Sequence, residues 1–194
     1  MPIANFFIKK LLGVFRNLNH YDEEDIDVIR YGLEASFWEI EKFVYMTIIF
    51  IALGLGWDFL AATIAVMTIR PMAGGYHAST AWRCFMWTIF GFILALIVLP
   101  LIALNNAIVI SVALFSLVTT FIASPFRSEQ MERIAKKEKD KQKRNIATVV
   151  TAIWFIVLFI NQQHFLAAPI LWIIFLQNVQ LLIPWYKRNF KKAT

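Results

Sequence analysis

One short segment combines a histidine with the only cysteine of the chain. His77 and Cys84 lie seven positions apart in residues 74–84, which read GGYHASTAWRC and lead into a long apolar run. An imidazole that takes the proton of a thiol creates a thiolate nucleophile, as cysteine peptidases require. The structural alternative is that Cys84 is a small buried hydrophobic residue and His77 an interfacial polar one.

This pair can react only if the next helix begins after His77. On one continuous helix, residues seven apart are separated by about 10.5 Å along the axis. A hydrogen bond between imidazole and thiol needs about 3 Å. Ser79 or Thr80 is a natural N-cap, so we expect the helix to start there. Cys84 would then lie one turn inside a helix N-terminus, where the dipole favours a thiolate.

The composition indicates a membrane protein. Of 194 residues, 59% are hydrophobic and 16% charged, whereas soluble domains have about half and a quarter. A single cysteine excludes an intramolecular disulfide. The first twenty residues carry Lys9, Lys10 and Arg16 without a long apolar core, so we expect no cleavable signal peptide.

Six apolar runs predict an all-α polytopic membrane protein. They cover residues 43–57, 59–69, 85–104, 107–124, 146–160 and 165–185. A span needs about 20 residues, within a range of roughly 17–25. The third, fourth and sixth runs meet this length, and the first and fifth meet it with flanking residues. The second is too short unless it tilts or ends in non-helical backbone buried in protein. We therefore predict one integral membrane domain over 1–194, with about six spans within 43–185.

The basic residues predict the orientation. With both termini cytoplasmic, the external turns lie near Asp58, Asn105–Asn106 and 161–164, and none contains Lys or Arg. All 19 basic residues then lie on the cytoplasmic side, as short loops require. That side includes a basic loop at 126–145 and a basic tail at 186–194. This distribution explains the net charge of +6 without a nucleic-acid partner.

Residues 1–42 are expected to form cytoplasmic or interfacial helices. One helical face collects Ile3, Phe7, Leu11, Val14 and Leu18, as in a helix that lies on a lipid surface. A second stripe collects Ile26, Ile29, Leu33, Phe37 and Ile40, and its helix is expected to continue into the first span. Glu34 and Glu39 lie near the boundary of that span. They would either pair with Arg30 and Lys42 or face an active centre.

The basic loop has two interpretations. Residues 127–144 carry eight basic and four acidic side chains. Such a run is commonly a solvated face and a topology signal. It is also suited to docking an acidic peptide tail, because clustered charge attracts an oppositely charged partner.

The segment around the cysteine resembles the accessory gene regulator B (AgrB) family of membrane cysteine endopeptidases, which process quorum-sensing peptide precursors. The resemblance rests on Gly75, His77 and Cys84 in a loop followed by a helix. It extends to the N-terminal region with residues 30–34 (RYGLE), the apolar runs and the basic loop. It implies that Cys84 is the nucleophile and His77 its base. The product would be a cyclic thiolactone or lactone, made without cofactor or metal.

The resemblance also implies partners and a location. The partners would be a peptide precursor, which the charge pattern suggests has an acidic C-terminal tail, the lipid bilayer and a second copy of the chain. The location would be the bacterial cell membrane. Further candidates for substrate binding are Gly74, Gly75, Arg70, Arg83, Glu34, Lys136, Lys137 and Lys139. Arg70 and Arg83 are equally suited to anchoring the membrane boundary.

A rival interpretation is a small peptide transporter or export partner. Broken helices, which transporters use, could occur at Pro100, Pro169 and Pro184. Polar residues also lie deep in the sixth run, namely Gln177, Asn178 and Gln180, although hydrogen bonds between helices explain them equally well. The scarcity of intramembrane charge argues against ion coupling. A non-catalytic scaffold is the third class, and it leaves the Gly-Gly-Tyr-His loop unexplained.

Overall fold

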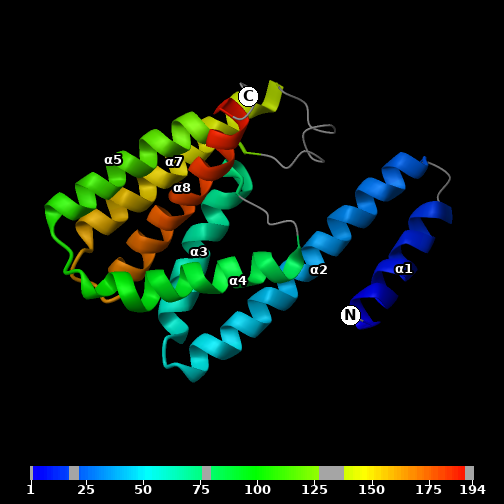
Figure 1. Ribbon diagram of the computed structural model, residues 1–194, viewed down its shortest axis with the longest axis horizontal. Coiled ribbons are helices and arrows are strands. Elements are labelled where there is room, and N and C mark those ends of the chain that lie inside the picture. Colours follow the sequence, from blue (N-terminus) through cyan, green and yellow to red (C-terminus); the bar gives the residue numbers. More distant parts are fainter. Residues whose placement is uncertain (1, 18–21, 76–79, 127–137, 191–194) are drawn as a thin grey trace. The chain divides into compact units, whose positions relative to one another are not determined.

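The computed structural model describes residues 2–17, 22–75, 80–126 and 138–190. Within these ranges the regular structure is helical (Figure 1), apart from one isolated backbone bridge between Gly74 and Phe126. The all-α class is therefore confirmed for the described chain. The chain divides into two compact units, residues 1–49 and 50–194.

The first unit contains α1 (Pro2–Asn17) and most of α2 (Glu23–Ala52). The Asp22 carboxylate accepts a 2.8 Å hydrogen bond from the Asp25 N–H at the start of α2, which satisfies one free donor there. The two helices pack through a cluster of apolar residues, namely Ile8, Leu12, Phe15, Ile26, Ile29, Leu33 and Phe37. The stripe predicted on α2 is thus confirmed except for Ile40, which is 59% exposed.

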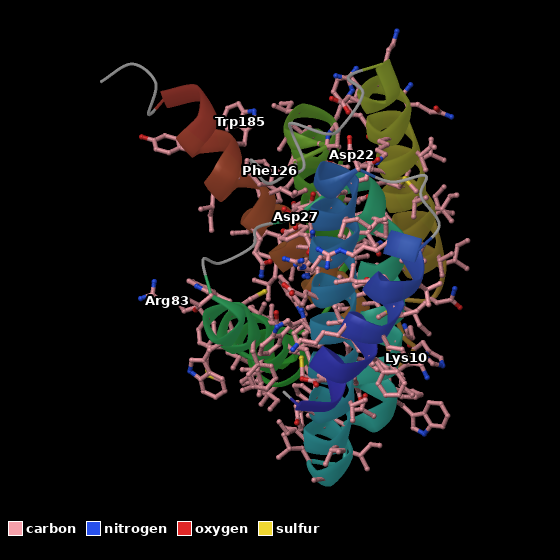
Figure 2. The ribbon with its side chains drawn as sticks, turned by 90° about the vertical axis from the view of Figure 1, so that its right-hand side faces the viewer. Lys10, Asp22, Asp27, Arg83, Phe126 and Trp185 are labelled. Carbon is pink, nitrogen blue, oxygen red and sulfur yellow. The ribbon has the colours of Figure 1, made fainter. Side chains whose placement is uncertain are left out.

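Helix α1 carries apolar side chains on two faces, and the sequence analysis found only one of them. Ile8 and Leu12 pack against α2, a contact that the predicted face does not include. The predicted face with Phe7, Leu11 and Val14 stays exposed. Lys10 is also exposed and extends away from the helix (Figure 2). The exposed apolar face is the one that the sequence assigns to a membrane surface.

The second unit is a helical bundle that carries the candidate site. Its helices are α3 (Gly56–Ala73), α4 (Ala81–Ile93), α5 (Asn106–Ala123), α7 (Glu138–Ile160) and α8 (Ala167–Phe190). Helices α3 and α5 each pack against both α7 and α8 (Figure 1). Helix α4 itself makes few contacts with α8. Most of the packing there comes from the two turns that follow α4.

The turn between α2 and α3 comes earlier than predicted. Gly54 has a φ of 75° and donates its N–H to the Ile51 carbonyl at 2.9 Å, a helix ending that glycine permits. The helical part of the first run therefore stops short of Trp57. Asp58 lies in the first turn of α3, where the helix dipole favours an acid. Helix α3 also continues through Pro71, beyond the predicted end of the second run.

The third run is helical but not uniformly α-helical. After α4 come a π-helical turn, η1 (Leu94–Val98), and a 3-10 turn, η2 (Leu99–Leu101). Pro100 explains the change, because proline lacks an N–H and its ring clashes with the carbonyl four residues earlier in an α-helix. Widening and then tightening the helix accommodates the proline.

Within the described residues, three helical segments are long and apolar enough to cross a membrane: Trp82–Leu101, Asn106–Ala123 and Asp140–Ile160. A shorter apolar stretch covers Ala167–Ile183 in α8. The predicted count of six would also require α2, α3 and α8. Helix α3 carries Asp58 and Arg70 near its two ends, which lowers its apolar character.

Polar side chains connect the helices of the bundle. The Thr120 hydroxyl donates a buried 2.7 Å hydrogen bond to Asn178 Oδ1, from α5 to α8. Trp154 Nε1 on α7 donates to Thr68 Oγ1 on α3 at 2.9 Å. Such bonds within a membrane contribute about 0.6–2 kcal/mol each. The interhelical role predicted for Asn178 is confirmed.

Candidate functional site

Helix α4 begins after His77 in the sequence. Its first residue is Ala81, and Thr80 is the N-cap with extended backbone (φ −131°, ψ 146°). Thr80 Oγ1 accepts a 3.3 Å hydrogen bond from the Arg83 N–H. The predicted helix start is confirmed, and Cys84 lies one turn inside the helix. His77 itself lies outside the described residues.

The backbone of Cys84 is held on both sides. Its N–H donates to the Thr80 carbonyl at 3.0 Å, and its carbonyl accepts from Thr88 Oγ1 at 2.8 Å. The side chain is a half-buried free thiol. Because Cβ atoms in a helix tilt towards the N-terminus, the Cβ of Cys84 points towards the start of α4.

The other end of that loop is fixed at Gly74. Gly74 has a φ of 82° and donates its N–H to the Arg70 carbonyl at 2.8 Å. The Phe126 N–H donates to the Ala73 carbonyl at 2.9 Å. A Cβ at position 74 would overlap the Phe126 carbonyl oxygen. Both the positive φ and this close backbone approach require glycine.

Gly75 lies against a basic side chain. It is buried, and a Cβ on it would lie 3.0 Å from Arg70 Nε. The structure thus brings Gly74, Gly75 and Arg70 together at the start of the loop. Their part in substrate binding stays a prediction. Arg83 is exposed at the first turn of α4, with its side chain extending away from the helix (Figure 2).

A third contact at Gly74 was missed by the sequence analysis. Gln177 Nε2 on α8 donates a 3.0 Å hydrogen bond to the Gly74 carbonyl. Gln177 is only 4% exposed. The sequence shows a polar residue in an apolar run and suggests a partner on another helix. The partner is instead the backbone of the loop, which no local pattern reveals.

The three candidate lysines are not placed at this site by the described structure. Lys136 and Lys137 lie outside the described residues, and only the backbone of Lys139 is described. The basic loop is also shorter than predicted, because α7 is already helical from Glu138. Early helix formation is reasonable because lysine and glutamate are good helix formers.

Glu34 is exposed in the first unit. Its role in substrate binding stays a prediction. The ion pair predicted between Glu39 and Lys42 is confirmed at 2.6 Å. Arg30 instead pairs with Asp27, at 3.4 Å. Among the described residues, no cluster of three or more His, Cys, Asp or Glu side chains could hold a metal ion.

Comparison with known proteins identifies the family. The family model of Accessory gene regulator B matches residues 2–181. The chain belongs to the AgrB family. An AgrB-like protein of Clostridium beijerinckii is 29% identical over 162 residues, covering 83% of this chain and 79% of that protein. One from Clostridium perfringens is 25% identical over 192 residues, covering 94% and 97%. No solved structure matches.

Membership in the AgrB family implies a role in processing quorum-sensing peptides of accessory gene regulator systems. The match includes both anchored ends of the loop, at Gly74 and Thr80. The fixed geometry described above therefore belongs to the part of the chain that the AgrB family model covers. Together with the apolar helices, the family also supports a membrane location.

We predict that Gly74→Ala lowers the thermal stability of the purified protein. The positive φ alone should cost about 1–3 kcal/mol, and the overlap with Phe126 adds to it. Gly54→Ala is the control for strain without overlap, since Gly54 has a φ of 75° and open space around its Cβ position. Gly32→Ala in α2 is the control with neither a positive φ nor a steric overlap. A Tm for Gly74→Ala equal to that of Gly32→Ala would contradict the assignment.

Proposed function

We propose that this chain is a membrane cysteine endopeptidase that cleaves a small peptide precursor through an acyl thioester on Cys84. The product is a cyclic thiolactone or lactone peptide. The observation that carries the proposal is the start of α4 at Ala81. It separates the histidine segment from the helix and leaves Cys84 at the helix entrance.

Chain length limits where the base can lie. His77 follows the fixed Gly75 by two residues and precedes the N-cap Thr80 by three. Its Cα therefore lies within about 7 Å of the first and about 11 Å of the second. Cys84 lies one helical turn beyond Thr80, and its Cβ tilts back towards the start of the helix. These limits support an imidazole close to the thiol, which a single continuous helix would prevent.

The chemistry proceeds in two acyl transfers. His77 takes the thiol proton, and the Cys84 thiolate adds to the carbonyl carbon of a peptide bond in the precursor. The C–N bond breaks, and the leaving amine takes its proton from the imidazolium. A cysteine or serine side chain of the precursor then gives its proton to His77 and attacks the thioester. The ring closes, the bond from acyl carbon to sulfur breaks, and the thiol of Cys84 is restored.

The entrance of α4 supplies hydrogen-bond donors for the transition state. The backbone N–H groups of residues 81–82 have no carbonyl partner within the helix. They are therefore suited to stabilise the oxyanion. Converting an amide into a thioester is unfavourable, whereas exchange between thioesters is nearly balanced. Removal of the products must therefore draw the reaction forward. Exclusion of water protects the activated acyl group from hydrolysis.

We also propose six spans with both termini in the cytoplasm. Three spans are α4, α5 and α7 with their flanking turns, and the others are α8 and the pair α2 and α3. Helix α8 lies along α3 and α5, so protein lines it and its short apolar stretch is tolerated. Arg144 of α7 lies 4.8 Å from the centroid of the Phe121 ring near the end of α5. A basic residue at the end of the bundle where α5 ends and α7 begins supports a cytoplasmic position for that end.

The transporter interpretation finds less support. Helix α8 continues through Pro169 and Pro184 without a break. Of these three prolines, only Pro100 coincides with a departure from α-helix. Gln177 and Asn178 are both committed to hydrogen bonds with the protein itself. Neither is therefore left to line a substrate path.

We predict that Cys84→Ala abolishes precursor cleavage. His77→Ala should lower it by at least about 10²-fold without loss of membrane-inserted protein. His164→Ala is the matched histidine control and should retain activity, because His164 lies in the turn before α8. The measurement is mass spectrometry of purified protein mixed with the precursor peptide encoded beside its gene, with detection of an acyl adduct on Cys84. Normal processing by Cys84→Ala would refute the mechanism.

For the topology, we predict that a single cysteine introduced at Gln163 in a Cys84→Ala background reacts with a membrane-impermeant maleimide in intact cells. A cysteine at Lys10 or Lys143 should react only after the cells are opened. These positions lie in the turn without basic residues and in two basic segments. Labelling of the Lys10 variant in intact cells would contradict a cytoplasmic N-terminus.

For the basic loop, we predict that reversing Lys136, Lys137 and Lys139 to Glu weakens binding of a precursor with an acidic tail. The interaction should also weaken as salt increases, because exposed charges are screened. Lys9→Glu with Lys10→Glu is the control for charge reversal at an exposed site on α1. Binding that is unchanged in the triple variant and insensitive to ionic strength would exclude a docking role.

A further inference from the structure

We infer that Gln177 is a positioning residue for the proposed dyad, acting through the Gly74 carbonyl. This inference rests on the proposed function and adds to it a residue from the last helix. Gln177 is almost fully buried, and its amide nitrogen donates to the Gly74 carbonyl at 3.0 Å. Gly74 is the last residue before Gly75 and the histidine segment.

Three hydrogen bonds fix the backbone at this point, and only one comes from a side chain. The Gly74 N–H is bound by the Arg70 carbonyl, and the Ala73 carbonyl by the Phe126 N–H. The Gly74 carbonyl is bound by Gln177. That carbonyl sets the plane of the peptide between Gly74 and Gly75. A change in this plane redirects the chain that leads to His77.

The effect should appear in the rate of reaction more than in substrate binding. Displacement of a reacting group by about 1 Å can lower the rate of a catalysed step by about 10²-fold. The side-chain amide of Gln177 donates to the loop backbone, so we assign it to positioning the base and not to proton transfer. Removal of its amide leaves the Gly74 carbonyl without this donor.

The neighbouring residue on α8 offers a matched control. Asn178 is also buried, and its Oδ1 accepts a 2.7 Å hydrogen bond from the Thr120 hydroxyl on α5. This bond joins two helices and does not involve the loop. Thr120→Val removes it with little change in volume. A general loss of helix packing would affect the Gln177 and Thr120 variants alike.

The test compares full-length Gln177→Met with Thr120→Val. The first readout is the rate of Cys84 alkylation by iodoacetamide as a function of pH, with His77→Ala as the reference for a thiol without its base. The second is kcat and KM for cleavage of the precursor. For Gln177→Met we expect the alkylation profile to move towards that of His77→Ala. We also expect kcat to fall by about 10–10²-fold with KM changed less than about twofold, while Thr120→Val follows the wild type.

The outcomes separate the two proposals. A wild-type profile and kcat in folded Gln177→Met, or an equal shift in Thr120→Val, would overturn the positioning role. Cleavage by Cys84→Ala would overturn the proposed function itself. Gln177→Asn keeps an amide but withdraws it by one methylene, and it should show the same two effects. It decides the question where Gln177→Met does not accumulate in membranes.

Discussion

The close approach of two backbone segments at Gly74 is the constraint on which the site depends. The end of α3 meets the residue that follows the turn after α5, and a side chain at position 74 would occupy the place of the Phe126 carbonyl oxygen. This contact fixes one end of the segment that carries His77. The Thr80 cap fixes the other end. With both ends held, the length of the chain between them sets the reach of His77, the proposed base.

The apolar surroundings explain why a few polar side chains are enough to hold the loop and the bundle in place. An unpaired polar group in hydrocarbon is costly, so each buried amide of α8 must find a partner in the protein. Gln177 and Asn178 are adjacent but turn to different segments, the loop backbone and α5. One helix thus stabilises both the bundle and the start of the loop. Helix α4, in contrast, contacts the bundle mainly through the turns that follow it.

Local patterns predicted the parts of the structure that have local causes. The Thr80 cap and the stripe through Ile26 follow from residue type and spacing, and both are confirmed. The contact between Gly74 and Phe126 joins positions far apart in the sequence, so no local pattern reveals it. Apolar residues lie on two faces of α1, and only packing against α2 decides that Ile8 and Leu12 are the buried ones. The π-helical turn before Pro100 was missed because an apolar run does not report helix pitch.

A half-buried thiol at the entrance of α4 suits acyl transfer better than hydrolysis. In the proposed reaction, water and a side chain of the bound precursor compete for the same thioester. The side chain belongs to the acyl group itself, and well-oriented intramolecular reactions reach effective molarities of about 10⁵–10⁸ M. That range is far above the concentration of water. Ring closure therefore prevails if the site holds the precursor in a bent conformation, even when some water reaches Cys84.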